Sequence, residues 1–463
     1  MPVSVREVEY FRQLSTNYDP KLARKKSADL MEYMNGELRG GHFAPDVMEY
    51  CMTVLASITL RCFRLNDVES QCQLLDGNVC ESIKTVLDTM GAENKVVARK
   101  GCEAVRNMAW GSTDFCDVIV DAKLGTTLCA MVAAHGHDTE VMRFAITSLA
   151  FLCFGNMDHA YSLAECGALE AVGKVRLQAA RQAHGTEKEE AEEALFETVV
   201  AACYAAKSLA LAGFALKVLH SGCIEVAVYY LEQHIAIKGP LREAAIYALS
   251  AICSLNSACR ERVGDTAAPR LVSEALSVDS SDPDRLSPAE LLNCCEAILH
   301  LSLNTNVSEE LSKHRAPAQL LDVLDSTLLG EEHGAEICTG ALLNLTRYGS
   351  TAAACRSFLA DAAPRSVHVM DRVRQTGTTG FRAREIAKTL LKVIADEVDI
   401  RREHIVPPHV LMGIVNASEP TSACTPLLAE LRIFNDGSLA STSGEGGHHQ
   451  HSFSRSASHQ VLL

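Results

Sequence analysis

Residues 145–172, AITSLAFLCFGNMDHAYSLAECGALEAV, carry the pattern that decides the fold. An apolar run is followed by a Gly-Asn break, a shorter segment, a Cys-Gly break and another apolar run. Asn156 stands where a helix N-cap is expected, because asparagine accepts hydrogen bonds from the free amides of a first helical turn. Gly167 stands just past the shorter segment, where glycine supplies the left-handed end of a helix. The stretch therefore predicts three helices joined by tight turns.

The first helix of this stretch recurs along the chain, and its copies begin at Val54, Ala104, Ala145, Ala205, Ala248, Ala297, Ala341 and Leu390. From 104 to 145 is 41 residues, from 205 to 248 is 43, and from 297 to 341 is 44. A period of about 40–47 residues is typical of armadillo and HEAT repeats. Other gaps are longer, and polar sequence within them predicts loops at residues 180–193, 279–288 and 374–380. Asp114 and Asn256 are expected as further N-caps, and Gly222 as a further helix end.

On these residues the chain resembles the armadillo repeat family over about residues 50–415, most closely at 145–172. The resemblance implies an all-α, right-handed superhelical solenoid of about eight three-helix repeats, whose long third helices line a concave groove. Residues 1–50 are expected to form a helical N-terminal cap, which protects the apolar face of a terminal repeat. The repeats are assigned to residues 51–415, with a charged insert near 180–197. Residues 416–463 are expected to form a short helical segment and then a disordered tail rich in Ser, Gly and His.

The composition favours closely packed helices in a reducing compartment. Apolar residues make up 48% of the chain and aromatic residues only 5%. The 18 cysteines form no CxxC pair, so they predict reduced core thiols in a cytoplasmic protein rather than a zinc site. Adjacent Cys294 and Cys295 point to different sides of one helix and are not both expected in the core. No signal peptide or transmembrane stretch is expected, and shuttling to the nucleus stays open.

The candidate groove carries basic residues, although the formal net charge is −15. Helical periodicity turns Arg106 and Lys207 away from the repeated alanines of their helices. Upstream on such helices lie Arg99, Lys100, Arg143, Arg242, Arg384 and Lys388. Basic side chains on a concave surface would attract acidic or phosphorylated segments. The alternative is that they only solvate an exposed helix face.

One position further along, the helices carry Asn107, His300 and Asn344. In nuclear-import adaptors of the armadillo family, a recurring Trp and Asn grip a basic extended peptide. Here Trp110 is the only tryptophan and no Trp–Asn array exists, so an import role is disfavoured. Trp110 is interpreted either as a packing residue at a helix end or as a binding platform.

The acidic insert at 180–197, which contains Glu197, is interpreted either as a solvated extension or as an internal ligand of the basic groove. In the tail, Ser454, Ser456 and Ser458 flank Arg455 and resemble phosphorylation sites of a basophilic kinase. No catalytic or cofactor motif is found, so neither an enzyme nor a bound cofactor or metal is expected. The acidic balance argues against a nucleic-acid partner.

The sequence therefore predicts a non-enzymatic scaffold or adaptor that binds an extended or acidic protein segment in the groove. Its candidate groove residues are Arg99, Lys100, Arg106, Asn107, Trp110, Arg143, Lys207, His300, Asn344 and Lys388. The alternative is a regulator of an enzyme, such as an exchange factor, chaperone cofactor or assembly factor, which clasps a globular partner.

Overall fold

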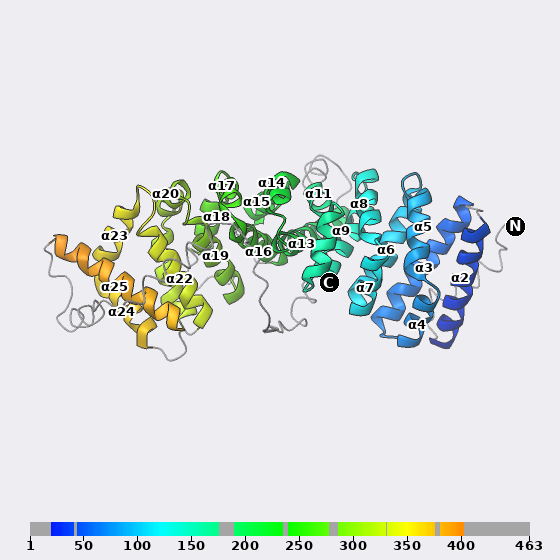
Figure 1. Cartoon of the computed structure of the whole chain (residues 1–463), viewed down its shortest axis with the longest axis horizontal. Helices are drawn as coiled ribbons and strands as arrows, with labels where there is room; N and C mark the ends of the chain where they lie inside the picture. The colour runs from blue at the N-terminus through cyan, green and yellow to red at the C-terminus, as the bar shows by residue number, and fades with distance from the viewer. Residues whose placement is uncertain are drawn as a thin grey trace, which may run out of the picture. The chain divides into compact units, whose positions relative to one another are not determined.

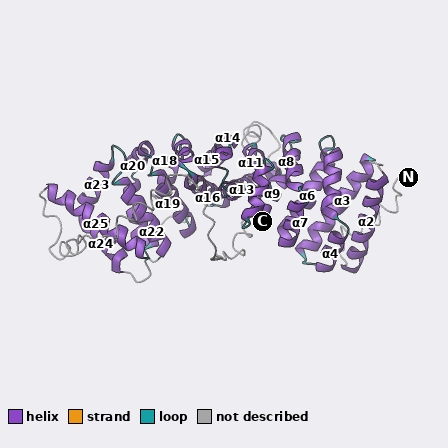
Figure 2. Ribbon diagram, viewed as in Figure 1, coloured by secondary structure: helices purple, strands orange, loops and turns teal. Residues whose placement is uncertain are grey.

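The computed structural model describes residues 20–40, 44–175, 189–234, 239–276, 286–329, 331–375 and 380–401. In these ranges the regular elements are helices, without a strand (Figure 2). The chain divides into two compact units, the first unit Met1–Val226 and the second unit Ala227–Leu463. The prediction of an all-α repeat protein is confirmed.

The recurring sequence pattern lies on a series of third helices. These are α3 (Pro45–Arg64), α6 (Lys95–Gly111), α9 (Thr139–Cys153), α13 (Glu189–Leu211), α16 (Pro240–Leu255), α19 (Pro288–Leu301), α22 (Glu332–Leu345) and α25 (Phe381–Arg401). In the first unit α3, α6, α9 and α13 pack successively side by side (Figure 1). In the second unit α16, α19, α22 and α25 do the same (Figure 1). Within each unit, every copy of the pattern is thus a helix that stacks on its counterpart in a neighbouring repeat.

Two shorter helices precede each third helix from α6 onward. The first helices are α4 (Val68–Asp76), α7 (Thr113–Asp121), α10 (Met157–Glu165), α14 (Ala215–Ser221), α17 (Ser257–Gly264), α20 (Thr305–Lys313) and α23 (Ala352–Asp361). The second helices are α5 (Val79–Val86), α8 (Leu124–Ala134), α11 (Ala168–Gly173), α15 (Cys223–His234), α18 (Ala268–Leu276), α21 (Ala316–Val323) and α24 (Ala363–Gln375). Short π-helical turns, η1 (Leu87–Gly91) and η2 (Leu324–Leu328), continue α5 and α21. At the N-terminal side α2 (Pro20–Gly40) packs on α3, α4 and α5, and the expected cap boundary at residue 50 falls inside α3.

Polar caps begin several of these helices. Asn156 accepts hydrogen bonds from the amides of Asp158 and His159, and Asn256 accepts one from Cys259, so both predicted N-caps are confirmed. Asp114 is not an N-cap, because α7 begins one residue earlier and places it in the first turn.

The turn from a first to a second helix repeatedly uses a left-handed residue. Gly167 (φ 92°) and Gly222 (φ 89°) adopt this conformation, as the sequence predicted. The same conformation occurs at Asn78 (φ 54°), Lys123 (φ 59°) and Arg315 (φ 62°), each immediately before a second helix. Such a conformation costs a side-chain-bearing residue about 1 kcal/mol. The packing of the two helices therefore determines the turn, whether or not glycine is present.

The third helices are buried on more than one side, because neighbouring third helices and the shorter helices cover them. On α9 every residue from Phe144 to Cys153 is buried. Cys294 and Cys295 are both fully buried, so the prediction that only one of them lies in the core is wrong. A two-sided environment of this kind accepts apolar residues at adjacent helical positions.

The predicted inserts fall only in part within the described residues. Helix α13 begins at Glu189, so residues 189–193 are helical rather than a loop, whereas 180–188 lie outside the described residues. Pro288 is the first residue of α19 and not part of a loop. A capping box stabilises the start of this helix: Ser287 is the N-cap and Glu290 is the third helical residue. The predicted loop at 374–380 overlaps the end of α24, because Gln375 is the last residue of that helix. Phe381 begins α25 directly after the predicted loop. The expected tail, including Ser454, Ser456 and Ser458, lies outside the described residues.

Burial controls the reactivity of the thiols. Burial, with a smaller contribution from Glu37, raises the pKa of the Cys51 thiol to about 12, whereas Cys72 is exposed. Because only the thiolate is an effective nucleophile, brief alkylation of the folded protein with iodoacetamide should modify Cys72 at least about tenfold more than Cys51. Peptide mass spectrometry measures both sites, and the difference should vanish in denaturant. Equal labelling in the folded state would contradict the burial of Cys51.

Candidate functional site

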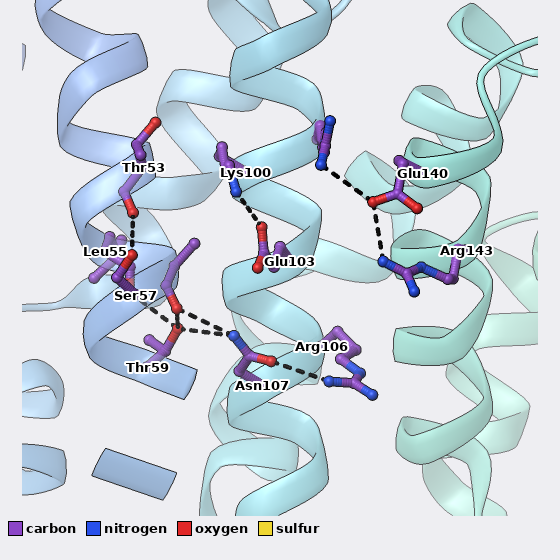
Figure 3. A network of polar contacts seen from close by, with 12 residues as sticks. Thr53, Leu55, Ser57, Thr59, Lys100, Glu103, Arg106, Asn107, Glu140 and Arg143 are labelled. Carbon is purple, nitrogen blue, oxygen red and sulfur yellow. Dashed lines mark hydrogen bonds and ion pairs between the residues drawn. The ribbon is translucent and has the colours of Figure 1, made fainter. Parts of the chain in front are cut away.

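The candidate site lies on α6 and α9 in the first unit. Four basic residues there, Arg99, Lys100 and Arg106 on α6 and Arg143 on α9, are called the basic face below. Figure 3 shows Lys100, Arg106 and Arg143 of this basic face. They are neither fully buried nor fully free in solvent, and the side chain of Arg143 retains 24% of its exposure. The guanidinium of Arg143 also lies 4.6 Å from the ring centre of Phe144, which restricts its orientation. Two stacked third helices thus present several cations on one surface.

Carboxylates from the same and neighbouring helices pair with most of these cations. Lys100 Nζ lies 2.7 Å from Glu103, and Glu140 forms an ion pair with Arg99 at 3.3 Å and accepts a hydrogen bond from Arg143 at 2.9 Å. Glu140 thus joins two of the four basic residues, Arg99 and Arg143, across α6 and α9, whereas Lys100 and Glu103 form a separate pair on α6 (Figure 3). The sequence identified the basic residues of these ion pairs but not Glu103 and Glu140, although their spacing of three residues from Lys100 and Arg143 was a usable signal.

Glu197 on α13 adds a carboxylate from a third repeat. Its Oε2 lies 3.3 Å from Nη1 of Arg143, although the two residues are separated by 54 positions in the chain. No local spacing indicates this pair, which depends on the stacking of α9 and α13. The basic face is consequently partly neutralised rather than a continuous basic groove.

Arg106 differs from its neighbours on the basic face. Among the described residues, Arg106 forms one hydrogen bond, a 3.4 Å contact to the side-chain oxygen of Asn107, and no ion pair with a carboxylate. Burial lowers the pKa of the Arg106 guanidinium, and the nearby Arg143 lowers it further, whereas Glu197 and Glu103 act in the opposite direction. A cation that has lost hydration without gaining an ion pair favours the approach of an anion.

Asn107 and Asn344 form contacts between repeats. Asn107 is 1% exposed, and its side-chain nitrogen donates to the carbonyl of Ala56 at 3.2 Å, whereas its side-chain oxygen contacts Arg106 (Figure 3). Asn344 is 7% exposed and donates to the carbonyl of Leu299 at 3.2 Å. Both amides therefore bond to the preceding third helix, which gives them a role in stacking.

Trp110 is half-buried on α6, one turn beyond Arg106. Its indole nitrogen is shielded from solvent and has no hydrogen-bond acceptor among the described residues. Indole N–H groups usually find a partner when buried. The position leaves both interpretations of Trp110 open, as a packing residue and as part of a binding surface.

The other predicted residues are distributed over the two units. Lys207 is half-buried on α13, and Lys388 on α25 pairs with Glu385 at 2.5 Å. His300 on α19 is half-buried, and burial lowers the pKa of its imidazole, with Glu296 opposing and Arg260 adding to the shift. The structure therefore brings Arg99, Lys100, Arg106 and Arg143 together, and places His300, Asn344 and Lys388 in the second unit.

The second unit presents a different surface on its third helices. Arg242, predicted for the groove, is only 2% exposed and forms a buried ion pair with Glu290 at 2.9 Å. On the same two helices, burial and Glu290 raise the carboxyl pKa of Glu243, and Glu296 accepts a hydrogen bond from Ser250 at 2.7 Å. The sequence pattern did not separate Arg242 from the exposed bases, because a buried and an exposed arginine have the same periodicity.

Comparisons with known proteins concern the fold. No protein-family model and no curated protein matches the sequence. Among solved structures, an engineered protein from a structural genomics consortium covers 92% of this chain and 94% of its own, with 17% identity and a TM-score of 0.57. A designed armadillo repeat protein in complex with the peptide (KR)4 covers 57% of this chain and 99% of its own, with 16% identity and a TM-score of 0.42. Computationally designed armadillo repeat proteins for modular peptide recognition match at 16% identity, a TM-score of 0.43 and the same coverage of both chains.

The stacked three-helix repeats and the match over nearly the whole chain define an all-α repeat protein with an armadillo-like fold. The assignment is to the fold and to no subfamily within it. In the described residues no cluster of His, Cys, Asp or Glu could hold a metal ion, and no helix is long and apolar enough to cross a membrane.

Proposed function

We propose that this chain is a non-enzymatic interaction scaffold whose basic face binds an acidic segment of a partner protein. The observation that carries the proposal is Arg106, a half-buried guanidinium without an ion-pair partner among the described residues. Arg99, Lys100 and Arg143 lie on the same pair of helices and would add further contacts to carboxylates or phosphates.

A stack of helices supports binding of this kind because it holds the side chains in place before the partner arrives. Each contact with an exposed charge contributes little, but several contacts along one rigid surface add up. The cytoplasmic location expected from the reduced cysteines belongs to the same proposal.

A labelled oligoglutamate peptide tests the proposed face directly. We expect saturable binding by fluorescence anisotropy at low salt, weaker binding as salt rises, and no comparable binding of an oligolysine peptide of equal length. The double variant Arg106→Gln, Arg143→Gln should raise the Kd by roughly tenfold, because it removes two cations and leaves Glu140 and Glu197 without Arg143.

Arg270→Gln is the matched control for this experiment. Arg270 is an exposed arginine of the second unit that pairs with Glu232 at 3.0 Å and Glu274 at 3.0 Å. It should leave the Kd unchanged, and circular dichroism should show the same helicity for all variants. Equal binding of both peptides, or equal loss in the control, would rule out the basic face as the binding surface.

A regulator that clasps a globular partner remains the second candidate. Its interface would be large and would not depend on the basic face alone. A stoichiometric folded partner that stays bound when excess oligoglutamate is added would favour this second function.

A further inference from the structure

Glu197 reaches the basic face from a different repeat and interacts with two of its members. It forms the 3.3 Å contact with Nη1 of Arg143, and its charge raises the pKa of Arg106 against the effect of burial. Arg106 and Arg143 repel each other electrostatically, since Arg143 lowers the pKa of Arg106. A negative charge near both guanidiniums is therefore favourable, and Glu197 supplies one.

The contact that Glu197 makes with Arg143 is weak for a contact between a carboxylate and a guanidinium. It is a single contact rather than a bidentate one, and the Nε of Arg143 has no hydrogen-bond partner among the described residues. The side chains of Glu197 and Arg143 keep 32% and 24% of their exposure. Water and salt therefore screen the pair, and an exchange of this carboxylate for another costs little stability.

The sequence around Glu197 continues its acidic character. Helix α13 has 23 residues, against 17 in α6 and 15 in α9, and its additional N-terminal part is the acidic sequence EEAEE at 189–193. The described helix thus joins an acidic stretch of the chain directly to the residue that contacts Arg143.

We propose that Glu197 is an internal competitor that occupies the anion position between Arg106 and Arg143, and that an acidic partner segment binds by replacing it there. This inference rests on the proposed function, because it assigns a regulatory contact to the same face. The partner's carboxylate takes the place of the Glu197 carboxylate, and the side chain of Glu197 turns toward solvent. Affinity for the partner is lowered by the free energy of the contact that has to be broken.

The variant Glu197→Gln tests the competition with the same oligoglutamate peptide and the full chain. Removal of the competing charge should lower the Kd by roughly threefold, the size expected for one exposed ion pair. In the double variant Arg106→Gln, Glu197→Gln the gain should be largely lost, because part of the position that Glu197 occupied has been removed.

Two controls separate competition from a general change of charge. Glu103→Gln removes one charge from the same face but leaves Arg143 and Glu197 paired, and Glu232→Gln removes one charge from the second unit. Neither should lower the Kd as much as Glu197→Gln. If wild-type protein binds oligoglutamate and Glu197→Gln binds no better than Glu103→Gln, the competition is overturned while the proposed function stands. If neither wild-type protein nor Glu197→Gln binds the peptide, the proposed function itself fails.

Discussion

Replacing Glu290 with alanine is expected to destabilise the protein by about 3–5 kcal/mol, the cost of breaking a buried ion pair by removing one of its members. Glu290 is 3% exposed and Arg242 2%, and Nε of Arg242 donates to Oε1 of Glu290 at 2.9 Å. The other oxygen of Glu290 accepts from the amide of Ser287 at 2.7 Å and completes the capping box of α19. One substitution therefore breaks the ion pair and a helix cap together.

Urea denaturation of the full chain, followed by circular dichroism, measures this loss. Glu232→Ala is the matched control, because Glu232 forms an exposed ion pair with Arg270 and should cost less than about 1 kcal/mol. The double variant Arg242→Met, Glu290→Met should recover part of the loss, since apolar residues of similar size remove both buried charges. A cost for Glu290→Ala no larger than that for Glu232→Ala would show that the pair does not stabilise the second unit.

Replacing Gly173 with alanine is expected to cost about 3 kcal/mol, at the upper end of the range for overpacking. A Cβ atom at Gly173 would lie 1.6 Å from the carbonyl oxygen of Ser221 and 3.3 Å from Cα of Gly222. Both neighbours are backbone atoms, so a side-chain rotation cannot relieve the overlap. Helices α11 and α14, which pack here, would have to move apart.

Gly36→Ala is the matched control for this prediction. Gly36 is exposed in the C-terminal part of α2, and a Cβ there would meet no atom within 4 Å. Alanine should stabilise α2 by about 0.5–1 kcal/mol, because glycine loses more backbone entropy in a helix. Thermal unfolding of the full chain compares the two variants. A stability for Gly173→Ala equal to that of wild type would contradict the close approach of α11 and α14.

The local sequence pattern was sufficient to predict the third helices and some of the helix ends. The repeated apolar positions predicted the third helices, and Asn156, Asn256, Gly167 and Gly222 were identified from residue type and position alone. Lys123 and Arg315 show where such reasoning stops, because both adopt the left-handed conformation without the residue type that indicates it. There the packing of two helices outweighs the preference of the residue.

The sequence predicted the basic residues of the candidate site but not the carboxylates that pair with them. The sequence identified Arg99, Arg106 and Arg143 on helical faces, but not which of them would be paired. Glu140 was within reach of sequence reasoning, since it precedes Arg143 by three residues on one helix. Glu197 was recognised as acidic, but its contact with Arg143 spans 54 positions of the chain and carries no local signal.

By itself the sequence determined the all-α repeat class, because hydrophobic periodicity and turn residues act over a few neighbouring positions. Only the tertiary structure decided that Arg242 is buried with Glu290, that Asn107 bonds to the preceding third helix, and that Arg106 forms no ion pair with a carboxylate of the described residues. The physical reason is that these partners lie on different helices. Their distances depend on how each third helix is shifted and rotated against the next, and many side chains along the whole interface determine that together.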